Sequence, residues 1–273
     1  MSEVLGVHGI WNYQTVTPEV AASALATKWA AFLGVEEERI AVAYYADRLR
    51  LGSHGGDAEL EALNRALGDQ PRELLLAWIA ELGWNASEPQ GWGAAPLRGL
   101  LDWFVQRFDL SRQTVDRFVA AFLSEVSQYL DLQDSGPRQA VRSVVGAAIS
   151  THQPRVVVAH SLGSVVAYET LWAYPRLKVD VLVTVGSPLA IPGRVFPVLQ
   201  PTPVDGRGRK PPGVRKWVNF SDVGDAVAVP KNLAKYFEGV DEDTNIATGM
   251  FWTHEVSHYL RNPQVRAGIL GLS

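Results

Sequence analysis

The chain contains 273 residues, of which 47% are hydrophobic and 20% are charged. This length and composition are typical of one α/β core that carries an insertion. The formal net charge of −4 and the lack of any run of lysine and arginine with interleaved aromatics argue against a nucleic-acid partner. The chain has no cysteine, which excludes disulfides, thiolate catalysis and cysteine-based metal sites.

The sequence contains neither a membrane-spanning pattern nor a secretory signal. No stretch reaches the ~18 apolar residues of a membrane helix, and the short apolar run at 3–7 ends at once in His8-Gly9. We therefore expect a cytoplasmic protein, and nothing in the sequence specifies its oligomeric state. His254, Glu255 and His258 form a string one residue longer than the HExxH zinc motif, so we expect no metal and no cofactor.

The first fifty residues predict a strand, a helix and a second strand. Residues 3–7 form a short apolar run, and Thr17-Pro18-Glu19 has the pattern of a helix start with proline in the first turn. We expect a helix over 18–33 that ends at Gly34, and a second strand within 39–49.

The next segment predicts helices alone. From 52 to 133 the pattern is helical, and its clearest helix follows Ser111, where apolar residues recur on one face up to Leu130. We interpret 52–133 as a helical insertion, and 1–51 with 134–273 as the core domain. The insertion is rich in aromatics: Trp78, Trp84, Trp92, Trp103, Phe104, Phe108, Phe118 and Phe122.

After the insertion, helices and β-rich runs alternate again. Helices are expected over 137–152 and 163–174, and strands over 155–161, 178–188 and 214–222. Because each strand is a nearly continuous β-branched run, the pattern predicts a mostly parallel central sheet with helices on both faces. Functional residues should then lie at the carboxyl ends of the strands. The loop at 189–213, with its basic cluster at Arg207, Arg209 and Lys210, is interpreted as a solvated surface loop.

Ser161 is the strongest candidate for a catalytic residue. The run Val156-Val157-Val158-Ala159-His160-Ser161-Leu162-Gly163 is a buried strand that enters a sharp turn and then a helix, with serine at the apex. Small residues two before and two after the serine let strand and helix pass closely, and the turn lifts the hydroxyl above the sheet. The backbone N–H of Leu162, at a helix N-terminus, would face a developing oxyanion.

Several motifs in chain order resemble the lipase-like α/β-hydrolases. They are VHGI at 7–10, AHSLGS at 159–164, TVGSP at 184–188, the Asp225-Ala226-Val227 string after a strand, and the late HYL at 258–260. The resemblance covers the chain outside the insertion and implies the α/β-hydrolase fold, with a triad in the order serine, acid, histidine. Ala159 stands where the family commonly has glycine.

The resemblance assigns the other members of the site with alternatives. Asp225 matches the family's acid, and Asp222 is the alternative, which could instead bind the turn backbone. His258 matches the family's histidine because it precedes Tyr259-Leu260, and His254 is the alternative. Ile10 follows the His8-Gly9 pair, where the family places the second oxyanion N–H.

These residues together lead to an expected reaction. We expect a serine hydrolase that cleaves a carboxylic ester through an acyl-enzyme on Ser161, with Asp225 and His258 completing the triad. In the family such insertions form a lid, and an aromatic lid favours a small-molecule or lipid-like substrate with an apolar acyl chain. The same triad would also serve a serine peptidase or an acyl thioesterase, and a non-catalytic binding protein on a hydrolase scaffold is the remaining alternative.

Overall fold

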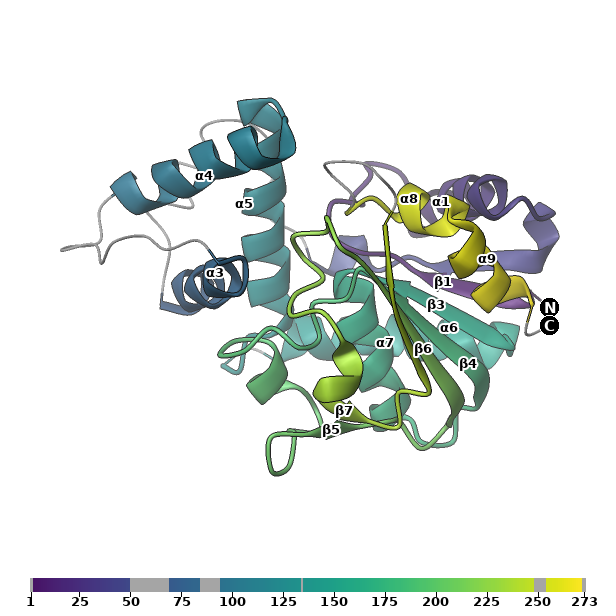
Figure 1. Cartoon of the computed structure of the whole chain (residues 1–273). Helices are drawn as coiled ribbons and strands as arrows, with labels where there is room; N and C mark the ends of the chain where they lie inside the picture. The colour runs from purple at the N-terminus through teal and green to yellow at the C-terminus, as the bar shows by residue number, and fades with distance from the viewer. Residues whose placement is uncertain (1, 50–68, 84–93, 134, 248–253, 272–273) are drawn as a thin grey trace.

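The protein has an α/β fold, in which a parallel sheet lies between helices (Figure 1). A computed structural model describes residues 2–49, 69–83, 94–133, 135–247 and 254–271. The expected architecture of a mostly parallel central sheet with helices on both faces is therefore confirmed.

In the described residues the central sheet has six strands, all parallel. They are β1 (Val4–Val7), β2 (Ile40–Ala43), β3 (Val156–His160), β4 (Val179–Val185), β6 (Val214–Asp222) and β8 (Glu242–Ile246). Their order across the sheet is β2-β1-β3-β4-β6-β8. Strand β2 lies on one side of β1, and β3 lies on the other side. The direction in which successive strands are added to the sheet therefore reverses between β1 and β3. Parallel sheets bind ligands at the carboxyl ends of the strands that flank such a reversal.

Helices cover both faces of this sheet. On one face lie α1 (Pro18–Leu33), α8 (Val256–Arg261) and α9 (Pro263–Leu270), and on the other lie α6 (Gly136–His152) and α7 (Leu162–Ala173) (Figure 1). Side chains alternate between the two faces along each strand: Val4 packs with α1 and α9, whereas Leu5 and Val7 pack with α6 and α7. Burial on both faces accounts for the uninterrupted β-branched runs in these strands.

The helix boundaries follow signals in the sequence. Helix α1 begins at Pro18 and is capped by Gly34, whose φ of 68° is left-handed, a conformation that glycine adopts without steric cost. Ser111 begins α5 (Arg112–Tyr129) by accepting a hydrogen bond from Thr114 N. The expected helices and strands are thus confirmed, whereas β8 and a short pair, β5 (Gly208–Arg209) with β7 (Phe237–Glu238), were not expected.

In the described part of the chain, three α-helices lie between β2 and α6: α3 (Asp69–Glu81), α4 (Ala94–Phe108) and α5. They extend beyond one end of the sheet, with α3 and α4 against α5 (Figure 1). Four of the aromatics noted above are buried among these helices, namely Trp78, Phe104, Phe118 and Phe122. Trp84, Trp92 and the Phe108 side chain lie outside the described residues, as does the expected boundary of the insertion near residue 52.

The helices in the described part of the chain are all too short or too polar to cross a membrane.

Candidate active site

Ser161 stands at the turn between β3 and α7, next to the reversal in strand order. Its φ of 55° and ψ of −132° are a conformation that a residue with a side chain rarely adopts. The turn is held by hydrogen bonds from Ser161 N to Val185 O at 3.1 Å and from Ser164 N to Ser161 O at 2.9 Å. Gly163 is required by the close approach of α7 to β1, because a Cβ there would overlap the carbonyl oxygens of Val7 and His8.

A continuous chain of hydrogen bonds joins Ser161, His254 and Asp225. The distance from Ser161 Oγ to His254 Nε2 is 2.9 Å, and His254 Nδ1 lies 2.9 Å from both carboxylate oxygens of Asp225. A carboxylate can only accept, so Nδ1 carries the proton and Nε2 is free to accept from the serine hydroxyl. All three residues are buried, which strengthens these interactions by excluding water.

The structure therefore corrects the expected histidine: His254, and not His258, is brought to Ser161 and Asp225. His254 precedes helix α8, which begins only at Val256, so the two histidines do not share a helix face. Tyr259 of α8 points into the core and is fully buried. His258 is its neighbour in the helix, rotated by about 100°, and therefore points elsewhere.

Several groups around Asp225 stabilise its negative charge. Its carboxylate accepts hydrogen bonds from Val227 N at 2.7 Å and from the Tyr259 hydroxyl at 2.6 Å. Burial alone would raise the pKa of Asp225, but His254, Lys231 and the Tyr259 hydroxyl hold that pKa well below its usual value. Asp225 therefore stays ionised at neutral pH.

The alternative acid, Asp222, has the other role that was considered for it. Its Oδ1 accepts from Gly224 N at 2.7 Å, an Asx turn at the end of β6. Tyr259 links the two aspartates, because its hydroxyl accepts from Asp222 N at 3.0 Å and donates to Asp225. Sequence reasoning missed Tyr259, although its place in the HYL motif was a signal.

The loop after β1 lies directly against Ser161. A Cβ on Gly9 would be 2.6 Å from Ser161 Cβ, so only glycine fits at this approach. His8 donates from Nδ1 to Gly9 O at 2.7 Å and accepts at Nε2 from Tyr45 N at 3.1 Å. Burial lowers the pKa of His8 to about 4, although the bond to Gly9 opposes this, so the ring is neutral and fixes the turn.

The two residues expected to donate to an oxyanion both lie near Ser161. Ile10 follows Gly9, which touches Ser161, and Leu162 is the first residue of α7. The N–H groups in the first turn of a helix have no partner within the helix, so α7 itself does not use the N–H of Leu162. Both residues are buried.

His160 is a further buried histidine in this site. Its ring centroid lies 4.9 Å from that of His254, and its Nε2 has no hydrogen-bond partner among the described residues. The pKa of His160 is lowered to about 3, mainly by burial and to a smaller extent by the nearby His254. It therefore packs beside His254 as an uncharged ring.

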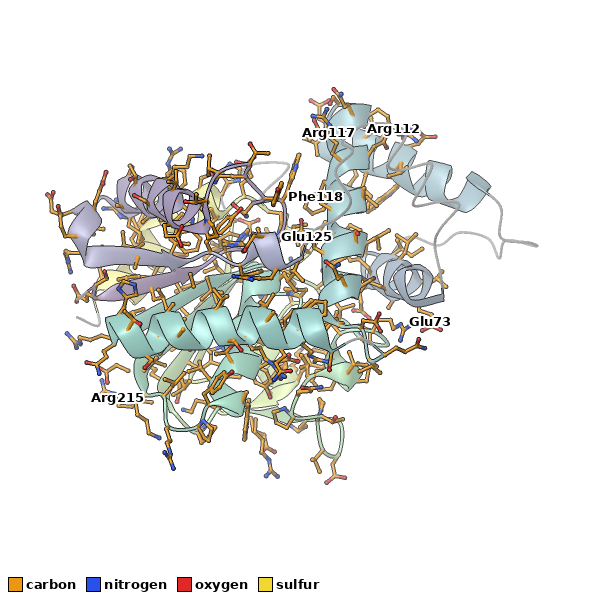
Figure 2. All side chains as sticks on the ribbon, turned by 180° about the vertical axis from the view of Figure 1, so that it is seen from behind. Glu73, Arg112, Arg117, Phe118, Glu125 and Arg215 are labelled. Atoms are coloured by element: carbon orange, nitrogen blue, oxygen red, sulfur yellow. The ribbon has the colours of Figure 1, made fainter. Side chains whose placement is uncertain are left out.

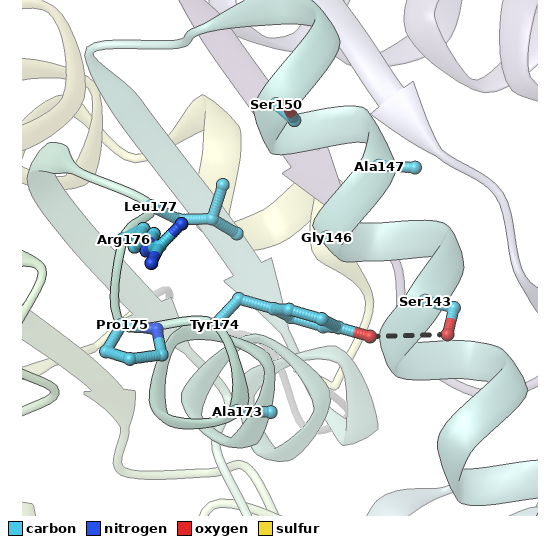
Figure 3. A pocket seen from close by; sticks show the side chains of 9 residues that line it. All are labelled: Ser143, Gly146, Ala147, Ser150, Ala173, Tyr174, Pro175, Arg176 and Leu177. Atoms are coloured by element: carbon cyan, nitrogen blue, oxygen red, sulfur yellow. Dashed lines mark hydrogen bonds between the residues drawn. The ribbon is translucent and has the colours of Figure 1, made fainter.

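A cavity of about 520 Å³ lies away from these residues, between α6 and the turn after α7 (Figure 3). Tyr174 crosses it toward Ser143, with 3.3 Å between the two hydroxyl oxygens. Ser161 precedes α7 and Tyr174 follows its 12 residues, so about 18 Å of helix separate the two. This cavity is not part of the Ser161 site.

Within the described residues, no cluster of three histidine, aspartate or glutamate side chains could hold a metal ion. The chain matches no family model, no curated protein and no solved structure.

Proposed function

We propose that this protein is a serine hydrolase of the α/β-hydrolase type, which cleaves a carboxylic ester through an acyl-enzyme on Ser161. The observation that carries the proposal is the hydrogen-bonded chain from Ser161 Oγ through His254 to Asp225, with 2.9 Å at each step. A serine hydroxyl, a neutral imidazole and an ionised carboxylate in this order are the parts of nucleophilic acyl transfer.

In the first half of the reaction, Ser161 Oγ attacks the ester carbonyl carbon while its proton passes to His254 Nε2. Asp225 stabilises the imidazolium that forms. The carbonyl oxygen becomes an oxyanion, which the N–H groups of Ile10 and Leu162 would bind. When the tetrahedral intermediate collapses, the bond to the alcohol oxygen breaks, and His254 returns its proton to the leaving alcohol.

In the second half, water attacks the acyl-enzyme carbonyl while His254 accepts a proton from it. The bond to Ser161 Oγ then breaks, the serine recovers its proton from His254, and the carboxylic acid leaves. The conformation of Ser161 supports this role, because a φ of 55° on a buried serine is retained only where the surrounding structure holds it.

An apolar acyl group is the preferred substrate under this proposal. Phe118 of α5 lies edge-on to His254, with 5.6 Å between ring centroids, so an apolar side chain is part of the immediate surroundings of the site. Most other described aromatics of 69–129 are buried in the packing of these helices, and Phe118 is therefore the residue that supports the preference.

The test is hydrolysis of p-nitrophenyl esters from acetate to palmitate. Wild type, Ser161→Ala and the control Ser150→Ala, an exposed serine on α6, are compared with matched thioester and peptide substrates. Hydrolysis by wild type and the control but not by Ser161→Ala is expected, with the rate peaking at an acyl chain longer than acetate. Equal hydrolysis by Ser161→Ala would contradict the proposal.

A further inference from the structure

Helix α5 presents two side chains to different parts of the site. Phe118 contacts the His254 ring, and Glu125, two helical turns further on, accepts a hydrogen bond from Trp11 N at 2.9 Å. A spacing of seven residues places both on one face of the helix. Figure 2 shows both on the side of α5 that faces the sheet.

The surroundings of Glu125 are unusual for a carboxyl group. Only 7% of the residue is exposed, and its Oε2 has no hydrogen-bond partner in the described part of the chain. Burial raises the pKa of Glu125 to about 7, opposed by the hydrogen bond from Trp11 N. An apolar side chain at this place would avoid the cost of burying the carboxyl group. What the carboxyl group provides in return is its hydrogen bond with Trp11 N.

Trp11 N and Ile10 O belong to the same peptide, between Ile10 and Trp11. Asn12 Nδ2 donates to Ile10 O at 2.8 Å, so both polar groups of the Ile10–Trp11 peptide are held, the carbonyl by Asn12 and the N–H by Glu125. Trp11 has a left-handed φ of 63°, which is unfavourable for a residue with a side chain. The hydrogen bond that Trp11 N donates to Glu125 Oε1 therefore stabilises this unfavourable conformation.

The Ile10 N–H belongs to the peptide between Gly9 and Ile10. Its carbonyl, Gly9 O, accepts from His8 Nδ1 at 2.7 Å and from Asn12 Nδ2 at 3.1 Å. In a trans peptide the N–H points opposite to the carbonyl, so fixing Gly9 O directs the Ile10 N–H. The peptides on both sides of Ile10 are thus held by hydrogen bonds. Among the described contacts, Glu125 is the one residue of α3–α5 that takes part in them.

We propose that Glu125 is a positioning residue for the oxyanion hole, which fixes the Ile10–Trp11 peptide and thereby aims the Ile10 N–H at the substrate oxyanion. This inference rests on the proposed function and adds to it that α5 is required for transition-state stabilisation.

The test compares Glu125→Gln with Glu125→Met on p-nitrophenyl butyrate. The amide oxygen of glutamine can still accept from Trp11 N, whereas methionine fills a similar volume without an acceptor. We expect Glu125→Met to lower kcat about 10- to 100-fold with KM within about threefold, since loss of one whole oxyanion donor lowers kcat about 10²- to 10³-fold. Glu125→Gln should remain within about threefold of wild type, as should Glu81→Ala, an exposed glutamate on α3.

Near-UV circular dichroism and urea unfolding establish that each variant is folded, and Ser161→Ala is measured beside them. If wild type shows no hydrolysis that depends on Ser161, the proposed function fails and this inference with it. If that hydrolysis is present but folded Glu125→Met is as fast as wild type, or Glu125→Gln is as slow as Glu125→Met, this inference alone is overturned.

Discussion

The Tyr259 hydroxyl donates a hydrogen bond to Asp225 Oδ2 at 2.6 Å and accepts one from Asp222 N at 3.0 Å. One side chain thus holds both the Asp225 carboxylate that faces His254 and the end of β6, the strand that precedes Asp225. Tyr259 is fully buried, so water cannot readily replace either bond.

Replacing Tyr259 by phenylalanine should weaken both catalysis and stability. We expect kcat to fall about 3- to 10-fold because the carboxylate loses a hydrogen bond that holds it in place. The free energy of unfolding should fall by about 1–3 kcal/mol because two buried hydrogen bonds, to Asp225 and from Asp222 N, are lost. Ester hydrolysis and urea unfolding measure the two effects. Tyr236→Phe, at a half-buried tyrosine after β6, is the control, and identical losses in both variants would contradict the specific role of Tyr259.

The close packing behind Ser161 depends on Gly163. Gly163→Ala should lower the free energy of unfolding by about 3 kcal/mol or more, since the added Cβ meets the rigid backbone carbonyls of Val7 and His8. Gly83→Ala is the matched control, because Gly83 has a φ of 72° but nothing within 4 Å of an added Cβ. It should cost only about 1 kcal/mol from its backbone conformation. Equal losses in urea unfolding would show that α7 can move away from β1.

The buried histidines predict loss of stability in mild acid. The pKa values of His8 and His160 are lowered by burial from 6.5 to about 4 and about 3. The unfolded chain therefore binds more protons below pH 6.5, and stability falls as the pH decreases from 6.5 toward 4, by on the order of 3 kcal/mol per histidine. His160→Asn should make this decline shallower, as measured by urea unfolding from pH 7.5 to 4.5. A decline as steep as in wild type would contradict the neutral, buried state of His160.

Glu125 acts on stability in the opposite sense. Burial raises its pKa from 4.5 to about 7, so the folded protein holds a proton that the unfolded chain loses, and stability falls as the pH rises between these two values. Glu125→Gln removes this compensation for the histidines. In the same experiment the variant should therefore lose stability more steeply than wild type between pH 7 and 4.5, and a slope unchanged from wild type would contradict the shifted pKa.

Much of the fold follows from the sequence because its signals are local. The β-branched runs of β3 and β4, the Pro18 and Gly34 boundaries of α1, and the Ser111 start of α5 depend on residues within a few positions of one another. Strand β8 was missed because its sequence, EDTNI, is polar and its burial is partial. Among the described strands it pairs with β6 alone, at one edge of the sheet. Polar residues are tolerated there, so neither composition nor periodicity indicates this strand.

The site was predictable to the extent that it depends on turns. Ser161 is identified by the small residues around it, and Asp225 by its place after β6. The histidine could not be predicted from the sequence, because the choice between His254 and His258 depends on where α8 begins and on which of its residues faces the core. Glu125 could not be found at all, since it is 114 positions from Trp11 and only the packing of α5 brings them together.

The most direct test of the account is covalent labelling with a fluorophosphonate, followed by mass spectrometry of the labelled peptide. Wild type, Ser161→Ala, His254→Ala and His258→Ala are compared at equal concentration. The account predicts labelling at Ser161 in wild type and in His258→Ala at similar rates, none at this position in Ser161→Ala, and a loss of about 10³-fold or more in His254→Ala. Rapid labelling of His254→Ala together with loss in folded His258→Ala, or no labelling of wild type, would contradict the triad of Ser161, His254 and Asp225.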